Sequence, residues 1–211
     1  MQGRKSYDNN NATIKSYIHS GIAYDNAFWN GSVMTYGDGG FQGGANNTGF
    51  APLTSLDVCG HEIGHGVCQH TSDLAYQKES GAMNEGFSDI WAACIEHYAI
   101  DSVDATLISG TSPGQTINGY KFFSIGEQID TRDATATAGN PPFVDKPSSN
   151  PASTALRYMD NPIAAGDPGS YWGTNFRDPE CSPNLANDEC GVHTNSGVLN
   201  HWFYYMVTGG T

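Results

Sequence analysis

The sequence predicts an α+β fold, with a strand-rich N-terminal part and a mainly helical C-terminal part. Residues 21–50 mix aromatic side chains with Gly and Asn, a composition typical of short strands and turns. Three later segments, 57–70, 81–99 and 195–208, are predicted to be helices, the last two from apolar residues at helical spacing. At 211 residues, of which 38% are hydrophobic, the chain is long enough to bury a core.

The charge of the chain limits its partners. It has 9 Lys and Arg residues against 22 Asp and Glu residues, a formal net charge of −13. Such a chain lacks the positive surface with which proteins bind nucleic acids or anionic membranes, so we expect no partner of either kind. No stretch approaches the ~18 consecutive apolar residues of a membrane-spanning helix, and the acidic groups suit divalent cations instead.

The first elements are predicted from short patterns. Residues 12–19, ATIKSYIH, are interpreted as a short helix or the end of one. Residues 21–50 are expected to form extended strands and turns, with an Asp-Gly turn signal at the end of VMTYGDG. The helix at 57–70 has Asp57 as its N-cap or first-turn residue. Its glycines each cost ~1 kcal/mol relative to Ala, which a buried helix lying close to other elements tolerates.

The two C-terminal helices are predicted to have apolar faces. On 81–99 the apolar stripe comprises Phe87, Ile90, Trp91, Cys94, Ile95 and Tyr98. On 195–208 it comprises Val198, Leu199, Trp202, Phe203 and Met206. Residues 101–155 are mostly Gly, Ser, Thr, Pro, Asn and Asp, interrupted by YKFFSIGEQI, so we expect a long inserted or ion-held loop there.

The cysteines divide into two groups. Cys181 and Cys190 lie in one polar loop, at a spacing that a disulfide can close. Cys59, Cys68 and Cys94 lie within predicted helices, where we expect them to be small buried hydrophobic residues. Cys59 and Cys68 lie about 13 Å apart along one helix axis, so they cannot bridge each other.

The sequence His61-Glu62-Ile63-Gly64-His65 carries the clearest chemistry. Two histidines at positions i and i+4 share a helix face, so both imidazoles can point at one ion. Glu62 lies beside that ion, where a carboxylate can act on a water bound to zinc. Taken alone, the pattern is also compatible with two surface histidines on an ordinary helix.

A row of carboxylates on the second helix favours the metal site. Glu85, Asp89 and Glu96 lie within ~40° of one another around the helix axis, and like charges on one face repel unless a cation faces them. A solvated acidic surface is the alternative, since the apolar residues lie on the other side of this helix. Opposite a di-histidine face, such a carboxylate is what a third zinc ligand requires, and Asp89 would accept a hydrogen bond from one ligand histidine.

Together these motifs resemble those of the thermolysin-like neutral zinc metalloproteases, the gluzincin group of zinc peptidases. The resemblance is carried by NAFWNGS followed by TYGDG, then by HEIGH, AYQKESGA, NEGFSD and GVHTNSG, in that family's order. It spans nearly the whole chain. The family's catalytic unit is longer at both ends, so we expect a chain that is truncated at both ends.

The resemblance implies a zincin-like fold in which the zinc-binding helix lies between the two lobes. Residues 1–70 would be part of the N-terminal β-rich lobe plus the HExxH helix. Residues 71–211 would be an incomplete, mainly helical C-terminal lobe, with the irregular insertion at about 101–155. The resemblance also implies a secreted, extracellular enzyme.

The implied reaction is zinc-dependent endopeptidase cleavage of a peptide or protein substrate, with Glu62 acting on the zinc-bound water. The residues that match the zinc ligands are His61, His65 and Glu85, and those that match their supporting partners are Asp89 and Asn84. The residues that match the donors to the oxyanion are Tyr76 and His193. Asp188 would orient His193. A Cys181–Cys190 bridge would brace this same loop.

Substrate contacts are implied likewise. Asn26 and the backbone of Ala27 would pair with an extended peptide, and Arg157 would hold the carbonyl just beyond the cut bond. Six apolar residues match pocket-lining positions: Phe50, Leu53, Val58, Ile125, Ile129 and Leu156. We therefore expect cleavage on the amino side of hydrophobic residues, although several of these side chains can equally pack the core.

The family also binds structural calcium beside the second helix, and Asp57, Glu96 and Glu127 match ligand positions. Two other functions remain open: a fragment that binds zinc but is inactive, and a non-enzymatic module that holds peptides in its cleft. If the family's last helices are missing, the third helix would expose Trp202 and Phe203, a patch that favours aggregation or a partner.

Overall fold

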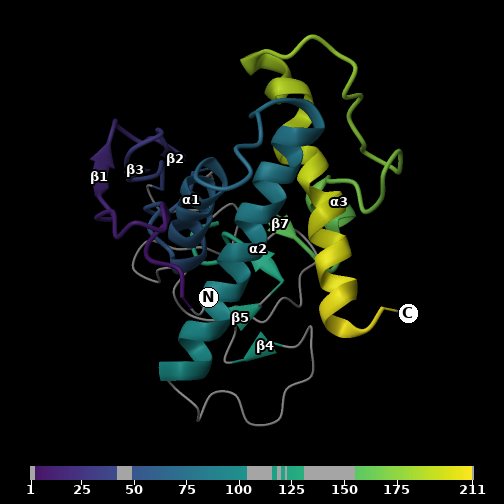
Figure 1. Ribbon diagram of the computed structural model, residues 1–211. Coiled ribbons are helices and arrows are strands. Elements are labelled where there is room, and N and C mark those ends of the chain that lie inside the picture. Colours follow the sequence, from purple (N-terminus) through teal and green to yellow (C-terminus); the bar gives the residue numbers. More distant parts are fainter. Residues whose placement is uncertain are drawn as a thin grey trace.

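A computed structural model describes residues 3–41, 49–103, 116–117, 120–121, 123–130 and 155–210 (Figure 1). A small strand-containing N-terminal part precedes a helical C-terminal part, which confirms the α+β class. The helices are α1 (Leu56–Gln69), α2 (Lys78–Val103) and α3 (Asp188–Thr208), with 3₁₀ turns η1 (Pro162–Ala165) and η2 (Leu185–Asn187). The strands are β1 (Ser16–Ser20), β2 (Ala27–Trp29), β3 (Met34–Gly37), β4 (Thr116–Ile117), β5 (Tyr120–Lys121), β6 (Ser124–Ile125) and β7 (Arg157–Tyr158).

The first three strands form one sheet in the order β1-β3-β2. The central strand β3 pairs parallel with β1 and antiparallel with β2. Met34 and Tyr36 alternate along β3 toward the core, where they are at most 2% exposed. They pack with Leu53 and with Val58 of α1. Within the described residues β2 has a neighbouring strand on one side only, so it is an edge strand.

The predicted short helix at residues 12–19 is wrong. Residues Ser16–Ser20 form β1, in which Ser16 and Tyr17 pair with Met34 and Thr35 of β3. A helical pattern this short is weak, because the first turn of a helix is costly to form. The backbone hydrogen bonds that β3 offers therefore decide the conformation.

Close packing between α1 and α2 explains the glycines of α1. A Cβ on Gly64 would lie 2.8 Å from the Cα of Ser88, and a Cβ on Gly60 would lie 3.1 Å from the Cα of Ala92. The two glycines thus let the helices approach more closely than any side chain would allow. This approach brings the histidine face of α1 to the carboxylate face of α2.

Helix α2 buries its polar face, which corrects the prediction for this helix. It lies between α1 and α3 and packs against both (Figure 1). Four polar side chains of α2 are at most 1% exposed: Glu85, Ser88, Asp89 and Glu96. Of the predicted apolar stripe, Tyr98 is 72% exposed and Phe87 37% exposed, whereas Ile90 packs against the core. The alternative of a solvated acidic surface is therefore excluded.

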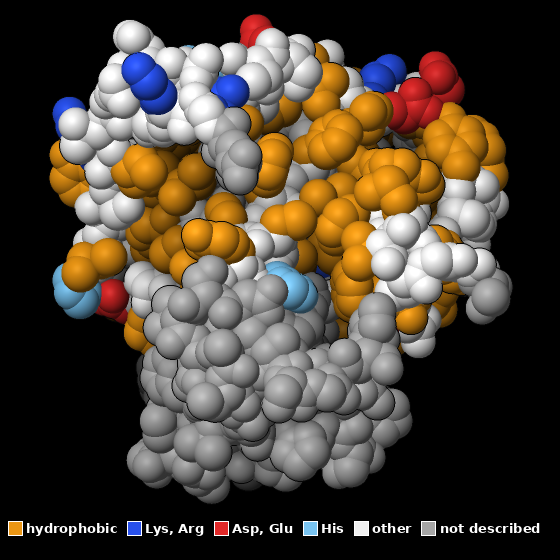
Figure 2. Space-filling model, turned by 60° about the horizontal axis from the view of Figure 1, so that its bottom comes forward, with side chains coloured by type: hydrophobic (Ala, Val, Ile, Leu, Met, Phe, Trp, Pro, Cys, Tyr) orange, Lys and Arg blue, Asp and Glu red, His pale blue; other side chains and the backbone are white. Residues whose placement is uncertain are grey.

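Helix α3 exposes much of its predicted apolar face. Phe203 lies against Phe123 in the core, with ring centroids 6.4 Å apart. Trp202 and Met206 are 53% and 57% exposed. Figure 2 shows one face of the molecule on which hydrophobic side chains gather with few charged ones between them. None of the described helices is long and apolar enough to cross a membrane.

The cysteines only partly follow the prediction. Cys181 and Cys190 form a disulfide, and Cys68 is buried. Cys59 is half-buried, and Cys94 is exposed because it lies on the outer side of α2, so the predicted burial of Cys94 is wrong.

The predicted insertion at 101–155 begins within α2, which continues to Val103. Most of residues 104–154 lie outside the described residues, apart from β4, β5 and the segment 123–130. The division of the chain at residues 70 and 71 stays a prediction.

Candidate metal centre and peptide-binding cleft

Three side chains predicted as zinc ligands converge between α1 and α2. His61 and His65 lie one turn apart on α1, and Glu85 faces them from α2. Their ligand atoms all lie within 4.8 Å of one another. Glu85 Oε2 is 3.3 Å from His61 Nε2, and Glu85 Oε1 is 3.4 Å from His65 Nε2. The part of the chain that the structure describes contains no other group of three His, Cys, Asp or Glu side chains gathered as closely.

Residues of α2 hold the outer nitrogens of both imidazoles. His61 Nδ1 lies 2.7 Å from Asp89 Oδ1, and His65 Nδ1 lies 2.8 Å from Asn84 Oδ1. Because these oxygens accept, each Nδ1 carries a hydrogen, so in the neutral form of each ring the lone pair is on Nε2, the nitrogen that faces Glu85. Ser88 Oγ lies 3.2 Å from His65 Nδ1 as well. Sequence reasoning missed Ser88, although it lies one turn beyond Asn84 on the same helix face.

Asp89 links this centre to β7 and α3. Arg157 donates from two guanidinium nitrogens to the two oxygens of Asp89, both at 2.7 Å. Asn200 Nδ2 donates to Asp89 Oδ2, also at 2.7 Å. Burial alone would raise the pKa of Asp89, but the charges of Arg157 and His61 outweigh burial and lower this pKa. Asn200 was not predicted, because nothing in its local sequence distinguishes it from other polar residues of α3.

The charges at the centre favour a cation. Burial opposes the ionisation of Glu85, but His193 and the two α1 histidines hold its pKa well below the usual value. Burial also opposes a charge on His61, but Asp89 and Glu85 outweigh burial and raise the pKa of His61 to about 10. Buried carboxylates therefore attract positive charge to this point. A divalent cation would supply that charge and leave both imidazoles neutral.

The donor set fits zinc. Two imidazole nitrogens and one carboxylate are a common ligand set of catalytic zinc, in which a fourth position stays open. Glu85 is fully buried, and its Oε2 makes no hydrogen bond with the described residues. Because a buried carboxylate oxygen without a hydrogen bond is costly, this atom is suited to ligate an ion.

Glu62 lies between the two histidines in the sequence of α1 and is 5% exposed. Burial raises the pKa of Glu62 to about 7, against the opposing charge of His61. Its Oε2 is buried and has no hydrogen bond to any residue that the structure describes. A carboxylate with a pKa near neutrality and an unused oxygen has the properties of a general base.

Tyr76, His193 and Asp188 gather on the other side of the centre. The hydroxyl of Tyr76 donates to Glu85 Oε1 and lies 3.1 Å from His193 Nε2. Asp188 Oδ1 lies 2.5 Å from His193 Nδ1, and Asp188 Oδ2 accepts the backbone N–H of His193 at 2.9 Å. Burial would lower the pKa of His193, but Glu85 and Asp188 outweigh burial and raise this pKa.

The proposed zinc ligands line a cleft of about 640 Å³, together with Glu62, Tyr76 and His193. Asn26 and Ala27, at the start of the edge strand β2, line it together with Arg157. Five of the six predicted pocket residues also line the cleft: Phe50, Leu53, Val58, Ile125 and Leu156. The sixth, Ile129, does not line the cleft, because it is 1% exposed and packs in the core with Met34.

Two family models cover the chain. The model of the thermolysin metallopeptidase catalytic domain matches residues 1–69, and the model of the thermolysin metallopeptidase alpha-helical domain matches residues 72–211. The chain belongs to the thermolysin metallopeptidase family.

Individual members of the thermolysin family match the chain along its whole length. The chain is 38% identical over 215 residues to a bacillolysin from Bacillus caldolyticus and to a thermolysin from Alicyclobacillus acidocaldarius subsp. acidocaldarius. Each match covers 100% of this chain and 30% of the relative. The chain thus spans about a third of these relatives' length. The solved precursor of protealysin from Serratia proteamaculans is 26% identical, with a TM-score of 0.64 over 98% of this chain and 53% of that one. This likeness confirms the thermolysin-like fold.

The calcium ligands expected of a thermolysin-family protein lie near the far end of the buried face of α2. Asp57 and Glu96 are 0% and 1% exposed. Asp57 accepts hydrogen bonds from Ser55 Oγ and from the backbone N–H groups of Val58 and Gly126. Glu96 accepts from Gln128 at 3.2 Å, and its Oε2 has no hydrogen bond within the described ranges. Burial and the charge of Asp57 raise the pKa of Glu96 to about 8.

Glu127, the third expected calcium ligand, is half-buried in the segment 123–130. The three acidic side chains do not form a group as close as the proposed zinc ligands. The pair Asp57 and Glu96 nevertheless places two buried carboxylates near each other, which is unfavourable without a proton or a cation.

Proposed function

We propose that the chain carries the active site of a zinc-dependent endopeptidase that cleaves peptide bonds on the amino side of hydrophobic residues. The observation that carries this proposal is the convergence of His61, His65 and Glu85 beside the buried carboxylate of Glu62, in one cleft. Membership of the thermolysin metallopeptidase family supports the same reaction.

In this proposal His61, His65 and Glu85 hold the zinc ion, and Asp89 and Asn84 keep the imidazoles in the tautomer that presents Nε2. When bound, zinc acts as a Lewis acid that polarises the peptide carbonyl and lowers the pKa of a bound water to about 7. Glu62, whose own pKa is about 7, takes a proton from the attacking water. It then delivers this proton to the amine that leaves.

Tyr76 and His193 are proposed to stabilise the oxygen on which negative charge develops. Tyr76 OH and His193 Nε2 lie 3.1 Å apart, so both can donate to one oxygen atom once the Tyr76 hydroxyl turns its hydrogen from Glu85 to the substrate. Asp188 occupies His193 Nδ1 and favours the protonated ring, which leaves the N–H at Nε2 for the substrate.

The cleft is proposed to hold an extended peptide. The peptide would add to the edge strand β2 through the side chain of Asn26 and the backbone of Ala27. Arg157 uses two of its five N–H donors on Asp89, which leaves donors for the carbonyl beyond the cut bond. The apolar lining by Leu53 and Val58 supports binding of a hydrophobic side chain.

Two further features belong to the same proposal. Asp57 and Glu96, with Glu127, are proposed to hold a calcium ion, which the unused buried oxygen of Glu96 supports.

The enzyme is proposed to be secreted and to act outside the cell, where a disulfide such as Cys181–Cys190 persists. Its partners would be peptide or protein substrates.

The test compares the full chain with its Glu62→Gln variant. Both proteins are loaded with zinc, the zinc content is measured, and a quenched fluorescent peptide with one hydrophobic residue is offered. We expect turnover by the wild-type chain, and a fall in kcat of about 10²- to 10⁴-fold in the variant at unchanged zinc content. Glu180→Gln, the same change at an exposed position outside the cleft, is the matched control.

The results also distinguish the alternatives. A folded, zinc-loaded chain that cuts no peptide would favour the inactive fragment. A chain that binds the peptide equally with and without Glu62, and never cuts it, would favour the binding module. Mass spectrometry of the products identifies the bond, and cleavage on the carboxyl side of hydrophobic residues would contradict the proposed specificity.

A further inference from the structure

The first four residues of α3 have a backbone conformation unfavourable to most residues. Four consecutive residues are left-handed, with φ values of 56° at Asp188, 49° at Glu189, 73° at Cys190 and 81° at Gly191. Glycine adopts this conformation readily, whereas a Cβ makes it unfavourable at the other three positions. Such a run persists only where the surrounding contacts impose it, and this one ends two residues before His193.

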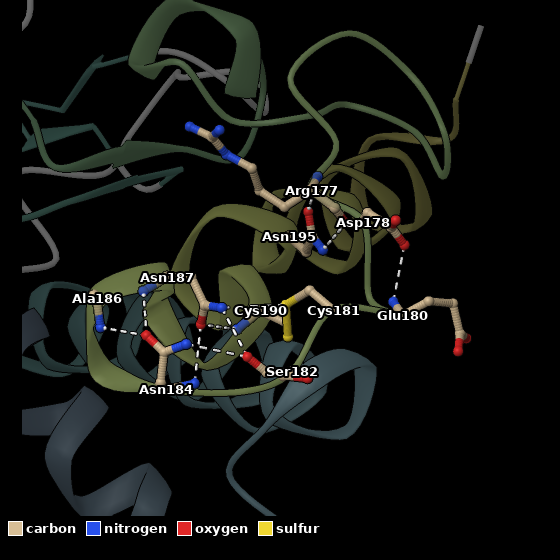
Figure 3. The surroundings of a disulfide bond; sticks show 10 residues. All are labelled: Arg177, Asp178, Glu180, Cys181, Ser182, Asn184, Ala186, Asn187, Cys190 and Asn195. Atoms are coloured by element: carbon tan, nitrogen blue, oxygen red, sulfur yellow. Dashed lines mark hydrogen bonds between the residues drawn. A yellow bond between two sulfur atoms is a disulfide. The ribbon is translucent and has the colours of Figure 1, made fainter.

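One set of contacts comes from the loop closed by the disulfide between Cys181 and Cys190 (Figure 3). Cys190 is 2% exposed, and its backbone N–H donates to the Asn187 side chain at 3.1 Å. The amide nitrogen of Asn187 in turn donates to the Ser182 carbonyl at 2.9 Å. The disulfide and Asn187 therefore both join the left-handed turn to the same loop.

A second set of contacts restrains the turn from the side of Arg177. A Cβ on Gly191 would lie 2.5 Å from the Cβ of Arg177, so the two backbones approach closely here. Asn195 accepts the backbone N–H of Arg177 at 2.8 Å and donates to its carbonyl at 2.9 Å (Figure 3). The start of α3 is thus restrained both before and after the turn.

The turn places Asp188 beside His193. Both oxygens of Asp188 contact His193, one at the ring Nδ1 and one at the backbone N–H. The other ring nitrogen of His193 faces Tyr76 OH at 3.1 Å and Glu85 Oε1 at 3.4 Å. Neither Cys181 nor Cys190 lines the cleft, and the turn joins the disulfide to His193.

We infer that the Cys181–Cys190 disulfide is a positioning element, which holds the left-handed turn so that Asp188 stays against His193. The inference rests on the proposed endopeptidase function, in which His193 donates to the developing oxyanion. Because His193 acts in the transition state, loss of the bridge lowers kcat and leaves KM and zinc content nearly unchanged.

Two double variants test whether the bridge acts through the turn. Cys181→Ala/Cys190→Ala removes the bridge and keeps a Cβ at a left-handed position. Cys181→Ala/Cys190→Gly removes the same bridge but places the residue that accepts a φ of 73° there. We expect kcat to fall about 10-fold in the first variant, which is the lower end of the effect of losing a histidine's orienting partner. In the second variant most of this activity should return.

Hydrogen exchange gives a readout that does not depend on activity. In the Ala variant the amides of residues 188–193 should exchange faster, because the His193 N–H loses its acceptor, and the Gly variant should restore protection. Exchange in α1 and α2 should not change. The matched control is Cys94→Ala, which removes an exposed thiol far from the turn in the sequence and should behave as the wild-type chain does.

Equal kcat and equal exchange in the Ala and Gly variants would overturn the inference. So would loss of zinc, or faster exchange throughout α1 and α2, because the bridge would then only stabilise the fold. Thiol titration of the denatured wild-type chain should find Cys59, Cys68 and Cys94 free, and titration of Cys181 and Cys190 as well would also overturn it. If the wild-type chain cuts no peptide, the proposed function fails, while exchange still decides whether the bridge positions Asp188.

Discussion

Two sets of buried carboxylates lie along the same face of α2, and they differ in what faces them. Glu85 and Asp89 meet histidines and Arg157, and their pKa values are lowered although both side chains are fully buried. Glu96, farther along, faces Asp57, and its pKa is raised to about 8. Burial alone therefore does not decide the charge of a carboxylate on this helix. The charged groups that lie against each carboxylate decide whether it is ionised.

The difference suggests two distinct ways to place a cation. Around Glu85 and Asp89 the protein supplies its own positive groups and oriented imidazoles, so the proposed zinc site is assembled in advance. Around Glu96 the protein supplies a second carboxylate, so the site holds either a proton or an added cation. The following substitutions test this comparison.

The largest effect is expected from Glu85→Gln. The amide has the same shape but is a weaker zinc ligand than the carboxylate, and it no longer balances the charge of the histidines. Loss of a residue that hydrogen-bonds to a metal ligand lowers metal affinity ~10- to 100-fold. Because Glu85 is itself a proposed ligand, we expect a larger fall in zinc affinity, and peptide cleavage should fall with it. Competition with a chromophoric chelator measures the affinity. Wild-type zinc affinity in this variant would exclude Glu85 as a ligand.

Asp89→Asn should have the next largest effect, on stability. The variant leaves the buried guanidinium of Arg157 without its carboxylate, which costs about 3–5 kcal/mol of the free energy of unfolding. Denaturant unfolding at pH 7 with a zinc chelator present measures this loss. Glu96→Gln is the matched control on the same helix, and we expect no such destabilisation from it. Equal losses in the two variants would remove the distinction between the two sites.

Glu96→Gln should change the pH dependence of stability. The pKa of Glu96 is about 8 in the folded chain against an ordinary 4.5, so between these values the folded state binds a proton that the unfolded state does not. The contribution of Glu96 to the free energy of unfolding therefore falls by about 1.4 kcal/mol per pH unit as pH rises through this window. The variant lacks this contribution, so in calcium-free buffer it should be the more stable protein at pH 8.

Calcium provides the complementary measurement for Glu96. A cation bound to its ionised form should stabilise the wild type at pH 8 by about 2.7 kcal/mol when calcium is at 100 times its Kd. Glu96→Gln should lose most of that gain. A pH slope and a calcium response that are the same in both proteins would show that Glu96 is neither the proton site nor a ligand.

Sequence reasoning reached the proposed metal centre because its main signals are local. Two histidines one turn apart share a helix face in any α-helix, so His61 and His65 were predictable as a pair. Glu85 and Asp89 were brought in by their own helical spacing and by the family resemblance. Their partners Ser88 and Asn200 were missed, because a lone Ser or Asn has no signal until another helix is packed against it.

The sequence predictions that the structure contradicts have one physical cause. Residues 12–19 form the strand β1 because β3 pairs with them, and Phe87 and Tyr98 face outward because polar partners bind the opposite side of α2. In each case a contact between segments distant in the chain outweighed the local pattern. Cys94 follows the same rule, since it lies on the outer side of α2.

The sequence alone determined the class of fold, the helix that presents the two histidines, and the kinds of ligand available to an ion, since these depend on spacing and side-chain chemistry. The tertiary structure decided which face of α2 is buried, which carboxylates are charged, and which groups meet at His193. Those properties depend on distances between side chains far apart in the chain, because desolvation and Coulomb interactions change steeply over a few ångströms.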